Sequence, residues 1–319
     1  MIKPLTVFVV GAGASVPFKF PSGLSLLRDA KVQKARVISQ RIHDKIAGED
    51  LHQFREMLRD CQELSLDAAL ESQPPILQAA GKWLIADQLL RCEAASRGVA
   101  PDGGDWIEHL FSLMTDGVGN TTDFLYYNAV WFVTYNYDRL IEHKLMAGLR
   151  SKYRQDWTNH KQKILERVIH LHGSLGDLNE GSQNYVPFGA VTTGGRAGSE
   201  YDRELAECMP SCERSIRIVH EVQDNQQFSQ ARGLLTQAER VFFLGFGFGV
   251  KNVDRLDLSC VNEKASVCYT RYGMTDQEWA YYIREPFNRA KITNTRGSSP
   301  GWDSLQLIRE NIGELVTRY

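Results

Sequence analysis

The feature that most constrains the fold is a short apolar run that ends in a glycine-rich turn. Residues 5–10 read LTVFVV, without the alternation of a half-exposed strand, and GAGAS follows at once. Such a run is typical of a central parallel strand that is covered on both faces. It is too short for a signal-peptide core or a membrane span. We therefore predict a buried first strand followed by a turn whose glycines allow close backbone approach.

Similar apolar runs recur along the chain, at residues 129–134, 167–171, 241–244 and 265–269, and residues 216–219 are a candidate for another. Helical patterns separate them, at about 22–115, from 138 onward, at 226–238, and in the tail at 275–288 and 303–317. Strands separated by helices predict an α/β fold with a doubly wound, Rossmann-like parallel sheet. We expect one domain over residues 1–319, with a mostly helical inserted subdomain at about 22–125 and an irregular segment at about 173–212.

Composition excludes several classes of protein. Apolar residues make up 43% and charged residues 24% of the chain, and the formal net charge is −2. A basic excess that would indicate direct nucleic-acid binding or a membrane surface is lacking. We expect a soluble, cytoplasmic protein with reduced thiols and no metal, since Cys208 and Cys212 form only a lone C-x-x-x-C and a structural zinc normally has four ligands.

The first motif is the GAGAS turn, with Gly11, Ala12, Gly13 and Ser15 after the first strand. Glycines in this context let the backbone approach a pyrophosphate, and a following helix would add N–H groups and a positive dipole end. Val16 stands where a full dinucleotide fingerprint has its third glycine, and no clear acidic residue ends a second strand about twenty residues on. An ordinary dehydrogenase is therefore disfavoured, and a glycine turn without a ligand is the alternative.

Two further motifs follow the second and third strands. Thr134 to Asp138 reads TYNYD, which places Asn136 and Asp138 where ligands of open α/β sheets bind, although Asp138 also suits a helix cap. His170 and His172 flank the end of the third strand, and strand alternation predicts that they lie on the same side. Either histidine alone is more often structural than catalytic.

The fourth motif is GFGFG, which follows the strand at 241–244. Its glycines, Gly245, Gly247 and Gly249, allow a ribose or an adenine to lie against the backbone, and Asn252 and Asp254 follow at an expected helix start. All four motifs fall at carboxyl ends of expected parallel strands, where one crevice can collect them.

This ordered set of motifs resembles the sirtuin family, specifically its bacterial zinc-less branch. The resemblance rests on GAGAS, TYNYD, the HGS at 172–174 and GFGFG, with an SLD segment at 65–67 in support, and it spans about residues 5–270. Two departures matter. Only Cys208 and Cys212 stand where sirtuin deacylases carry four zinc-binding cysteines, and residues 16–20 lack the acid–arginine element of that family. Both departures fit the branch whose members hydrolyse NAD itself.

The resemblance implies a division of roles within the site. Asn136 would position the ribose and the attacking water, His172 would act as the general base with a pKa near neutrality, and Asp138 would orient Asn136 or the loop. The remaining residues would bind NAD as substrate. The phosphates would be held by Gly11, Ala12, Gly13 and Ser15, and the adenosine half by Gly245, Gly247 and Asn252; Thr134 would also contact NAD. Residues 18–20, with Tyr135 and Tyr137, could close over the nicotinamide.

The leading hypothesis is an NAD hydrolase that releases nicotinamide and ADP-ribose, a triggered effector in bacterial anti-phage defence. We expect a homo-oligomer, with the sensor in a partner such as an ATPase or a nuclease encoded beside it. One alternative is an NAD-dependent protein deacylase or ADP-ribosyltransferase. A second alternative is a non-catalytic NAD or ADP-ribose-binding assembly subunit, although a pure binder has little need of both Asn136 and His172.

Overall fold

A computed structural model describes residues 1–32, 45–46, 48–154, 158–191, 200–218 and 226–316. Its centre is a six-stranded sheet in the order β3-β2-β1-β4-β5-β6, with parallel pairing throughout. The strands are β1 Thr6–Val10, β2 Val130–Thr134, β3 Val168–His170, β4 Arg240–Leu244, β5 Ser266–Tyr269 and β6 Thr295–Gly297. The expected doubly wound α/β fold is therefore confirmed, and its strand order is that of the dinucleotide-binding fold.

Apolar packing on both faces explains why β1 carries no alternation of polar residues. Its five residues are all buried. On one face, Phe8 stands opposite Phe132 and Phe242 of the neighbouring strands, with ring centroids 5.4 and 5.2 Å apart. On the other face, Val7 and Val9 join a second cluster. Burial on both sides fixes β1 at the centre of the sheet.

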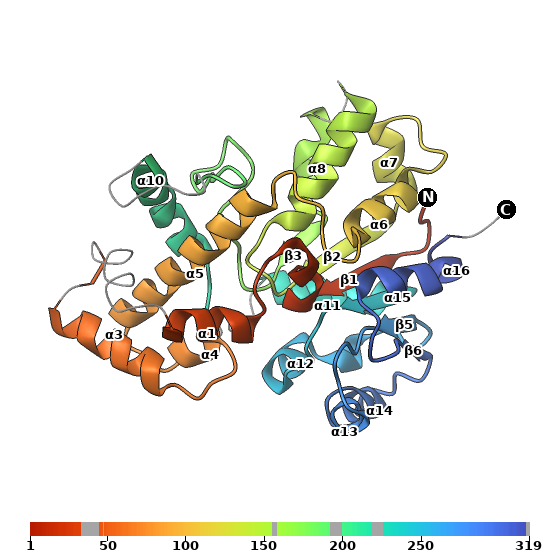
Figure 1. Cartoon of the computed structure of the whole chain (residues 1–319). Coiled ribbons are helices and arrows are strands. Elements are labelled where there is room, and N and C mark those ends of the chain that lie inside the picture. Colours follow the sequence, from red (N-terminus) through yellow and green to blue (C-terminus); the bar gives the residue numbers. More distant parts are fainter. Residues whose placement is uncertain (33–44, 47, 155–157, 192–199, 219–225, 317–319) are drawn as a thin grey trace.

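Helices cover the two faces of the sheet separately (Figure 1). One face packs with α6, α8 and α15, whose buried residues join the cluster around Phe8, and α7 lies beside them; the other face packs with α11, α12 and α14. These helices are α6 Trp106–Thr115, α7 Thr121–Tyr127, α8 Leu140–Tyr153, α11 Gln226–Gln237, α12 Val250–Leu256, α14 Glu285–Arg289 and α15 Ser304–Glu310. Short helices α9 Lys161–Leu165, α13 Asp276–Trp279 and α16 Ile312–Leu315 complete this part.

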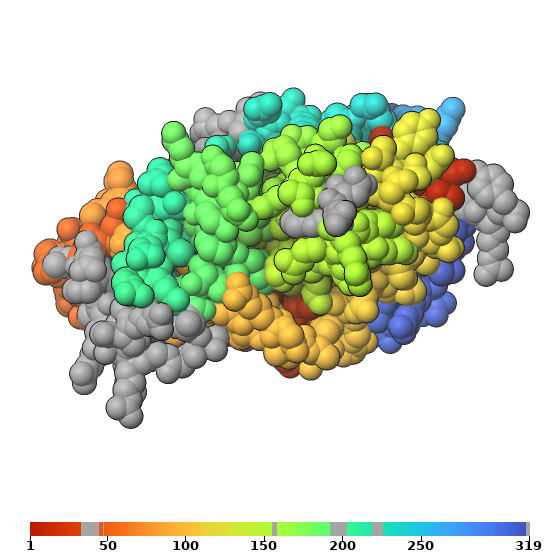
Figure 2. Space-filling view, turned by 90° about the horizontal axis from the view of Figure 1, so that it is seen from above, coloured from red at the N-terminus to blue at the C-terminus, as the bar shows by residue number. Residues whose placement is uncertain are grey.

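A second group of helices extends from one end of the sheet (Figures 1 and 2). It consists of α1 Gly23–Val32, α3 Gly48–Asp60, α4 Leu66–Leu70, α5 Pro75–Ser96 and α10 Glu200–Ser215. We call this group the helical lobe. The lobe includes α10, which comes much later in the chain than the other four helices. In contrast, α6 and α7 belong to the stretch expected to be inserted, but they pack beside α8 over the sheet.

A buried ion pair joins the helical lobe to the start of α8. Arg139 and Glu93 of α5 are both almost fully buried, and Nη2 of the arginine lies 2.6 Å from the Glu93 carboxylate. The Arg139 guanidinium also donates to the carbonyl oxygens of Val186 and Pro187, and Glu93 accepts from the N–H of Gly189 at 3.1 Å. Each charge is therefore satisfied where the TYNYD segment enters α8.

Two expectations about local structure are wrong, and one strand was not expected. The irregular stretch at 173–212 contains α10 in its last part, because Leu205, Cys208, Met209 and Cys212 recur at helical spacing and form a buried face against α5. Residues 216–218 form no strand, although Ile216 and Ile218 are buried. The sixth strand, β6, reads TRG and is too short and polar to be recognised in the sequence.

The described residues contain no helix that is both long and apolar enough to span a bilayer.

Candidate functional site

The main cleft opens at the carboxyl ends of the strands, where β1 and β4 lie side by side. From β1 the chain proceeds through β2 to β3 on one side, and from β4 through β5 to β6 on the other, so this is the point where the winding direction reverses. Ligands of open α/β sheets bind at such a point. The cleft measures about 1060 Å³ and reaches from the sheet to the helical lobe. That volume lies slightly above the usual range of about 300–1,000 Å³ for ligand pockets, which suits an extended ligand.

The GAGAS and GFGFG loops interlock at the floor of this cleft. The N–H of Gly13 donates to the carbonyl of Gly245 at 3.0 Å. A Cβ at Gly11 would lie 2.6 Å from that same carbonyl oxygen, and a Cβ at Gly245, where φ is +56°, would lie 1.9 Å from the nitrogen of Ala14. Gly247 differs, because a Cβ there meets nothing within 4 Å. Three of the glycines therefore serve the contact between loops, and Gly247 faces open space in the cleft.

The GAGAS backbone offers less to a phosphate than the sequence suggests. The segment forms one-turn 3-10 helices, Ala12–Ala14 and Val16–Phe18, and α1 begins only at Gly23. The N–H groups of Ala14 and Ser15 donate to carbonyls within the turn, at 3.0 Å each. The expected N-terminus of a following α-helix is therefore absent at this turn, because Val16 and Pro17 open a second turn in its place. Ala12 and Gly13 line the cleft directly.

Asn136 is held by a buried polar network behind the cleft wall. Its side-chain Nδ2 donates to the carbonyl of Gly11 at 3.2 Å and to Oγ of Ser15 at 3.1 Å, and its backbone N–H donates to Oγ1 of Thr134 at 3.0 Å. Ser15 in turn donates to the Asp138 carboxylate at 3.0 Å. Both amide hydrogens of Asn136 are thus committed, and its Oδ1 is the acceptor left for a ligand at the cleft.

Ser15, Thr134 and Asp138 support the site from behind and do not line the cleft. Asp138 also accepts from the N–H of Leu140, the first residue of α8, at 3.2 Å, although the N-cap position itself is occupied by Arg139. Burial raises the pKa of Asp138 to about 6. The structure therefore places Ser15 away from any bound phosphate and makes Asp138 an orienting group, one step removed from Asn136.

His172 lines the cleft, although the residue is only 5% exposed. Tyr135 and Phe228 lie beside it, at centroid distances of 5.5 and 6.0 Å. Its Nδ1 is buried without a hydrogen-bond partner among the described residues. Burial and then the nearby Arg255 charge lower the pKa of His172 to about 4. The expectation of a pKa near neutrality is therefore wrong, and the imidazole is neutral at pH 7.

His170 and His172 diverge, contrary to the expectation from strand alternation. β3 ends at His170, so alternation does not extend to His172. The His170 ring lies 2.8 Å from the Asn136 carbonyl and 2.6 Å from the Glu142 carboxylate of α8. Burial would lower the pKa of His170, but the charge and hydrogen bond of Glu142 outweigh it and hold that pKa above its usual value. His170 thus positions the backbone of the TYNYD segment from the α8 side of the sheet.

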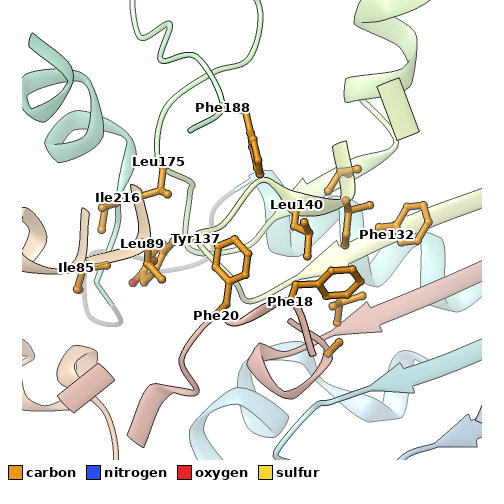
Figure 3. Packing of buried hydrophobic residues seen from close by; sticks show 14 of the residues in the cluster. Phe18, Phe20, Ile85, Leu89, Phe132, Tyr137, Leu140, Leu175, Phe188 and Ile216 are labelled. Atoms are coloured by element: carbon orange, nitrogen blue, oxygen red, sulfur yellow. The ribbon is translucent and has the colours of Figure 1, made fainter. Parts of the chain in front are cut away.

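The tyrosines of TYNYD reach the cleft, whereas the aromatic residues after GAGAS do not. Tyr135 donates its hydroxyl to the carbonyl of Asn252 at 2.9 Å, and Tyr137 donates to Asp67 of α4. Phe18 and Phe20 are buried in the hydrophobic core beside Tyr137 (Figure 3). An aromatic lid formed by residues 18–20 is therefore wrong, since the side chains of Phe18 and Phe20 fill the junction between the sheet and the helical lobe.

The carboxyl end of β5 contributes residues that sequence reasoning missed. Thr270 accepts from the N–H of Gly245 at 2.8 Å, which fixes the start of the GFGFG loop. Arg271 follows it at the cleft, and Asp303 and Ser304 at the start of α15 complete this end. The signal was available, because Thr270 and Arg271 directly follow an expected strand. Asn252 lines the same part of the cleft, together with Gly245 and Gly247.

The paired cysteines serve the packing of α10. Cys208 and Cys212 are buried, and Cys212 donates weakly to the carbonyl of Leu175 at 3.3 Å. Burial raises the pKa of both thiols, that of Cys212 to about 12. Within the described part of the chain, no group of three or more histidine, cysteine, aspartate or glutamate side chains is placed to hold a metal ion.

Comparison with protein-family models and with curated proteins returned no match for this chain.

Proposed function

We propose that this protein is an NAD hydrolase, which cleaves the bond between nicotinamide and ribose to give nicotinamide and ADP-ribose. The observation that carries the proposal is the meeting of Asn136 and His172 in one cleft at the winding reversal of a dinucleotide-type sheet. The resemblance of the four motifs to zinc-less sirtuin-like proteins supports the same activity, and with it the role of a triggered effector in anti-phage defence with a separate sensor partner.

The chemistry needs little acid–base assistance from the protein. Nicotinamide in NAD is already a cationic leaving group, so no general acid has to protonate it. The bond electrons pass to the nicotinamide nitrogen, and positive charge develops on the ribose as in glycoside hydrolysis. Water then forms the new bond to C1′ and releases one proton to the solvent. The protein must hold the ribose, exclude competing nucleophiles and place one water.

The two polar side chains at the cleft suit these tasks. Asn136 Oδ1 is an acceptor whose direction is fixed by the network through Ser15 to Asp138. His172 presents a neutral imidazole, because burial and Arg255 lower its pKa to about 4. A neutral imidazole accepts a hydrogen bond from a ribose hydroxyl or from the water, and its weak basicity matches a reaction in which the leaving group departs early.

The cleft also has room for both halves of the dinucleotide. Asn136 and His172 mark the ribose that reacts, and the floor formed by Gly13 and Gly245 would lie beneath the pyrophosphate. Gly247 leaves open space for the adenosine half, where Thr270 and Arg271 add polar groups. NAD is in this proposal a substrate, held across the reversal point.

The test uses the purified chain and its variants with NAD. Asn136→Ala and His172→Ala should each abolish nicotinamide release, while the circular dichroism spectrum shows that each variant keeps the fold; because both side chains are buried, the melting temperature should fall below that of the wild type. His52→Ala, on the exposed face of α3, is the matched control and should retain activity. Undiminished turnover in both cleft variants would refute the proposed site.

A further inference from the structure

A second hollow lies beside the main cleft, at the carboxyl ends of β5 and β6. It measures about 650 Å³, and only Arg271 is shared with the main cleft. Its principal residues are Tyr269, Arg271, Asp276, Trp279, Arg284 and Ser298. We call it the Trp279 groove. Its size is within the usual range for small-molecule sites, of about 300–1,000 Å³.

Trp279 lies close to two guanidinium groups. Its indole N–H donates to the hydroxyl of the buried Tyr269 at 2.9 Å, which sets the orientation of the ring. The guanidinium carbons of Arg271 and Arg284 each lie 5.4 Å from the ring centroid. Arg284 ends a π-helical turn over Ala280–Arg284, and such turns often occur at functional sites. Two cations that come from separate segments therefore converge on one aromatic ring.

Both arginines keep donors available for a ligand. Arg271 Nε donates to the carbonyl of Ser298 and Nη1 donates to Asp276, each at 2.9 Å, which leaves three of its five N–H groups. Arg284 has neither a hydrogen bond nor an ion pair with any residue that the structure describes. The geometry thus presents a preorganised pair of guanidinium groups with spare donors.

The acidic residues of this segment do not neutralise the pair. Asp276 contacts Arg271 alone, and its side chain is 88% exposed, so water competes strongly for that contact. Glu278 accepts from both the N–H and the hydroxyl of Thr275, which commits it to capping α13. The groove therefore retains an excess of positive charge.

We propose that the Trp279 groove binds a phosphate-bearing small anion through Arg271 and Arg284. Guanidinium groups pair with phosphate oxygens through two parallel hydrogen bonds, which lysine cannot provide. Trp279 contacts both cations, so its fluorescence would report on a ligand that binds them. This site shares Arg271 with the proposed NAD cleft, whereas Trp279 and Arg284 lie outside that cleft, and its occupancy does not depend on NAD cleavage.

The experiment follows tryptophan fluorescence of the full chain during titration with inorganic phosphate, pyrophosphate and ATP. Pyrophosphate should change the emission saturably in the wild type and leave it unchanged in Trp279→Phe. Arg284→Gln should raise the pyrophosphate Kd about tenfold, as the loss of one charge-assisted contact predicts. Arg289→Gln removes an exposed arginine five residues further along and should keep the wild-type Kd. Isothermal calorimetry on the same variants measures binding without relying on the tryptophan.

The outcomes separate the possible sources of the phosphate. Tighter binding of ATP than of pyrophosphate would identify a nucleotide-borne phosphate, and equal binding would identify the free anion; either result supports the groove. An absence of saturable binding by both methods overturns the proposal. So does an equal loss of affinity in Arg284→Gln and Arg289→Gln, because that result would show only general attraction to surface charge. Failure here would leave the NAD hydrolase proposal intact, since none of these variants alters Asn136 or His172.

Discussion

The glycines of the GFGFG loop should respond differently to alanine, because they have different neighbours. At Gly245 the added Cβ would lie 1.9 Å from the backbone nitrogen of Ala14 and 2.4 Å from the carbonyl carbon of Gly13, and φ is +56°. A left-handed alanine costs about 1–2 kcal/mol, and forcing two backbones apart adds about 1–3 kcal/mol. The gain from a less flexible unfolded chain offsets about 0.4–1 kcal/mol. We expect Gly245→Ala to lower the free energy of unfolding by about 2–4 kcal/mol.

Gly247→Ala is the matched comparison within the same loop. Nothing lies within 4 Å of its added Cβ, so stability should stay close to that of the wild type. If NAD lies along this loop, the new methyl group would occupy ligand space, and the Kd for NAD should rise by about tenfold or more, the effect of about 1.4 kcal/mol.

Differential scanning fluorimetry and NAD calorimetry on both variants test this difference. Gly245→Ala should lower the melting temperature by roughly 3–6 °C, which is what a loss of about 2–4 kcal/mol produces in a chain of 319 residues, and Gly247→Ala should leave it almost unchanged. A wild-type melting temperature for Gly245→Ala would refute the argument from loop interlocking. Equal loss of stability in both variants would refute it as well.

Three further predictions concern buried ionisable side chains. Since burial and Arg255 lower the pKa of His172 to about 4, nicotinamide release should stay constant down to about pH 5.5, and an acidic limb centred near 6.5 would contradict the neutral imidazole. Burial raises the pKa of Asp138 to about 6, so the folded state holds this proton more tightly than the unfolded state and loses stability as the pH rises from about 4 to above 6. Asp138→Asn should remove this loss of stability, which amounts to about 3 kcal/mol at pH 7.5. Urea titrations at several pH values test this, and the same pH dependence of the free energy of unfolding in wild type and variant would rule out the raised pKa of Asp138. Glu93→Gln should leave the buried Arg139 without its counter-charge and cost about 3–5 kcal/mol in chemical denaturation. The control, Glu56→Gln on the surface, should lower the free energy of unfolding by less than about 1 kcal/mol. Similar losses in Glu93→Gln and Glu56→Gln would argue against a buried ion pair.

Strand positions could be predicted because their signal is local. Continuous apolar runs such as that of β1 fix both the strand and its place at the centre of the sheet. The same rule failed at β6, where Arg296 and Gly297 give no apolar signal, and at Ile216, where burial comes without strand pairing. α10 was missed because its buried face meets α5, more than one hundred residues earlier in the chain, and only that contact makes the helix favourable.

The residues that line the cleft could be predicted in part. Asn136 and His172 follow expected strands, and parallel strands bring their carboxyl ends to one edge. Their detailed roles depend on contacts across the fold that no local pattern contains. Ser15 is committed to Asp138, more than one hundred residues away, and the pKa of His172 is set by burial and by Arg255 on α12. The role of the GAGAS glycines could not be predicted for the same reason, because they pack against Gly245, which lies far away in the sequence.

The central claim is tested most directly by the products formed from NAD without any peptide. Purified chain is incubated with NAD, with and without an acetylated peptide and with candidate partner proteins, and nicotinamide and ADP-ribose are separated by chromatography. We expect both products in equal amounts, independent of the peptide, and their loss in Asn136→Ala. Tight binding of NAD without turnover under all these conditions, or product formation only with the acetylated peptide, would contradict it.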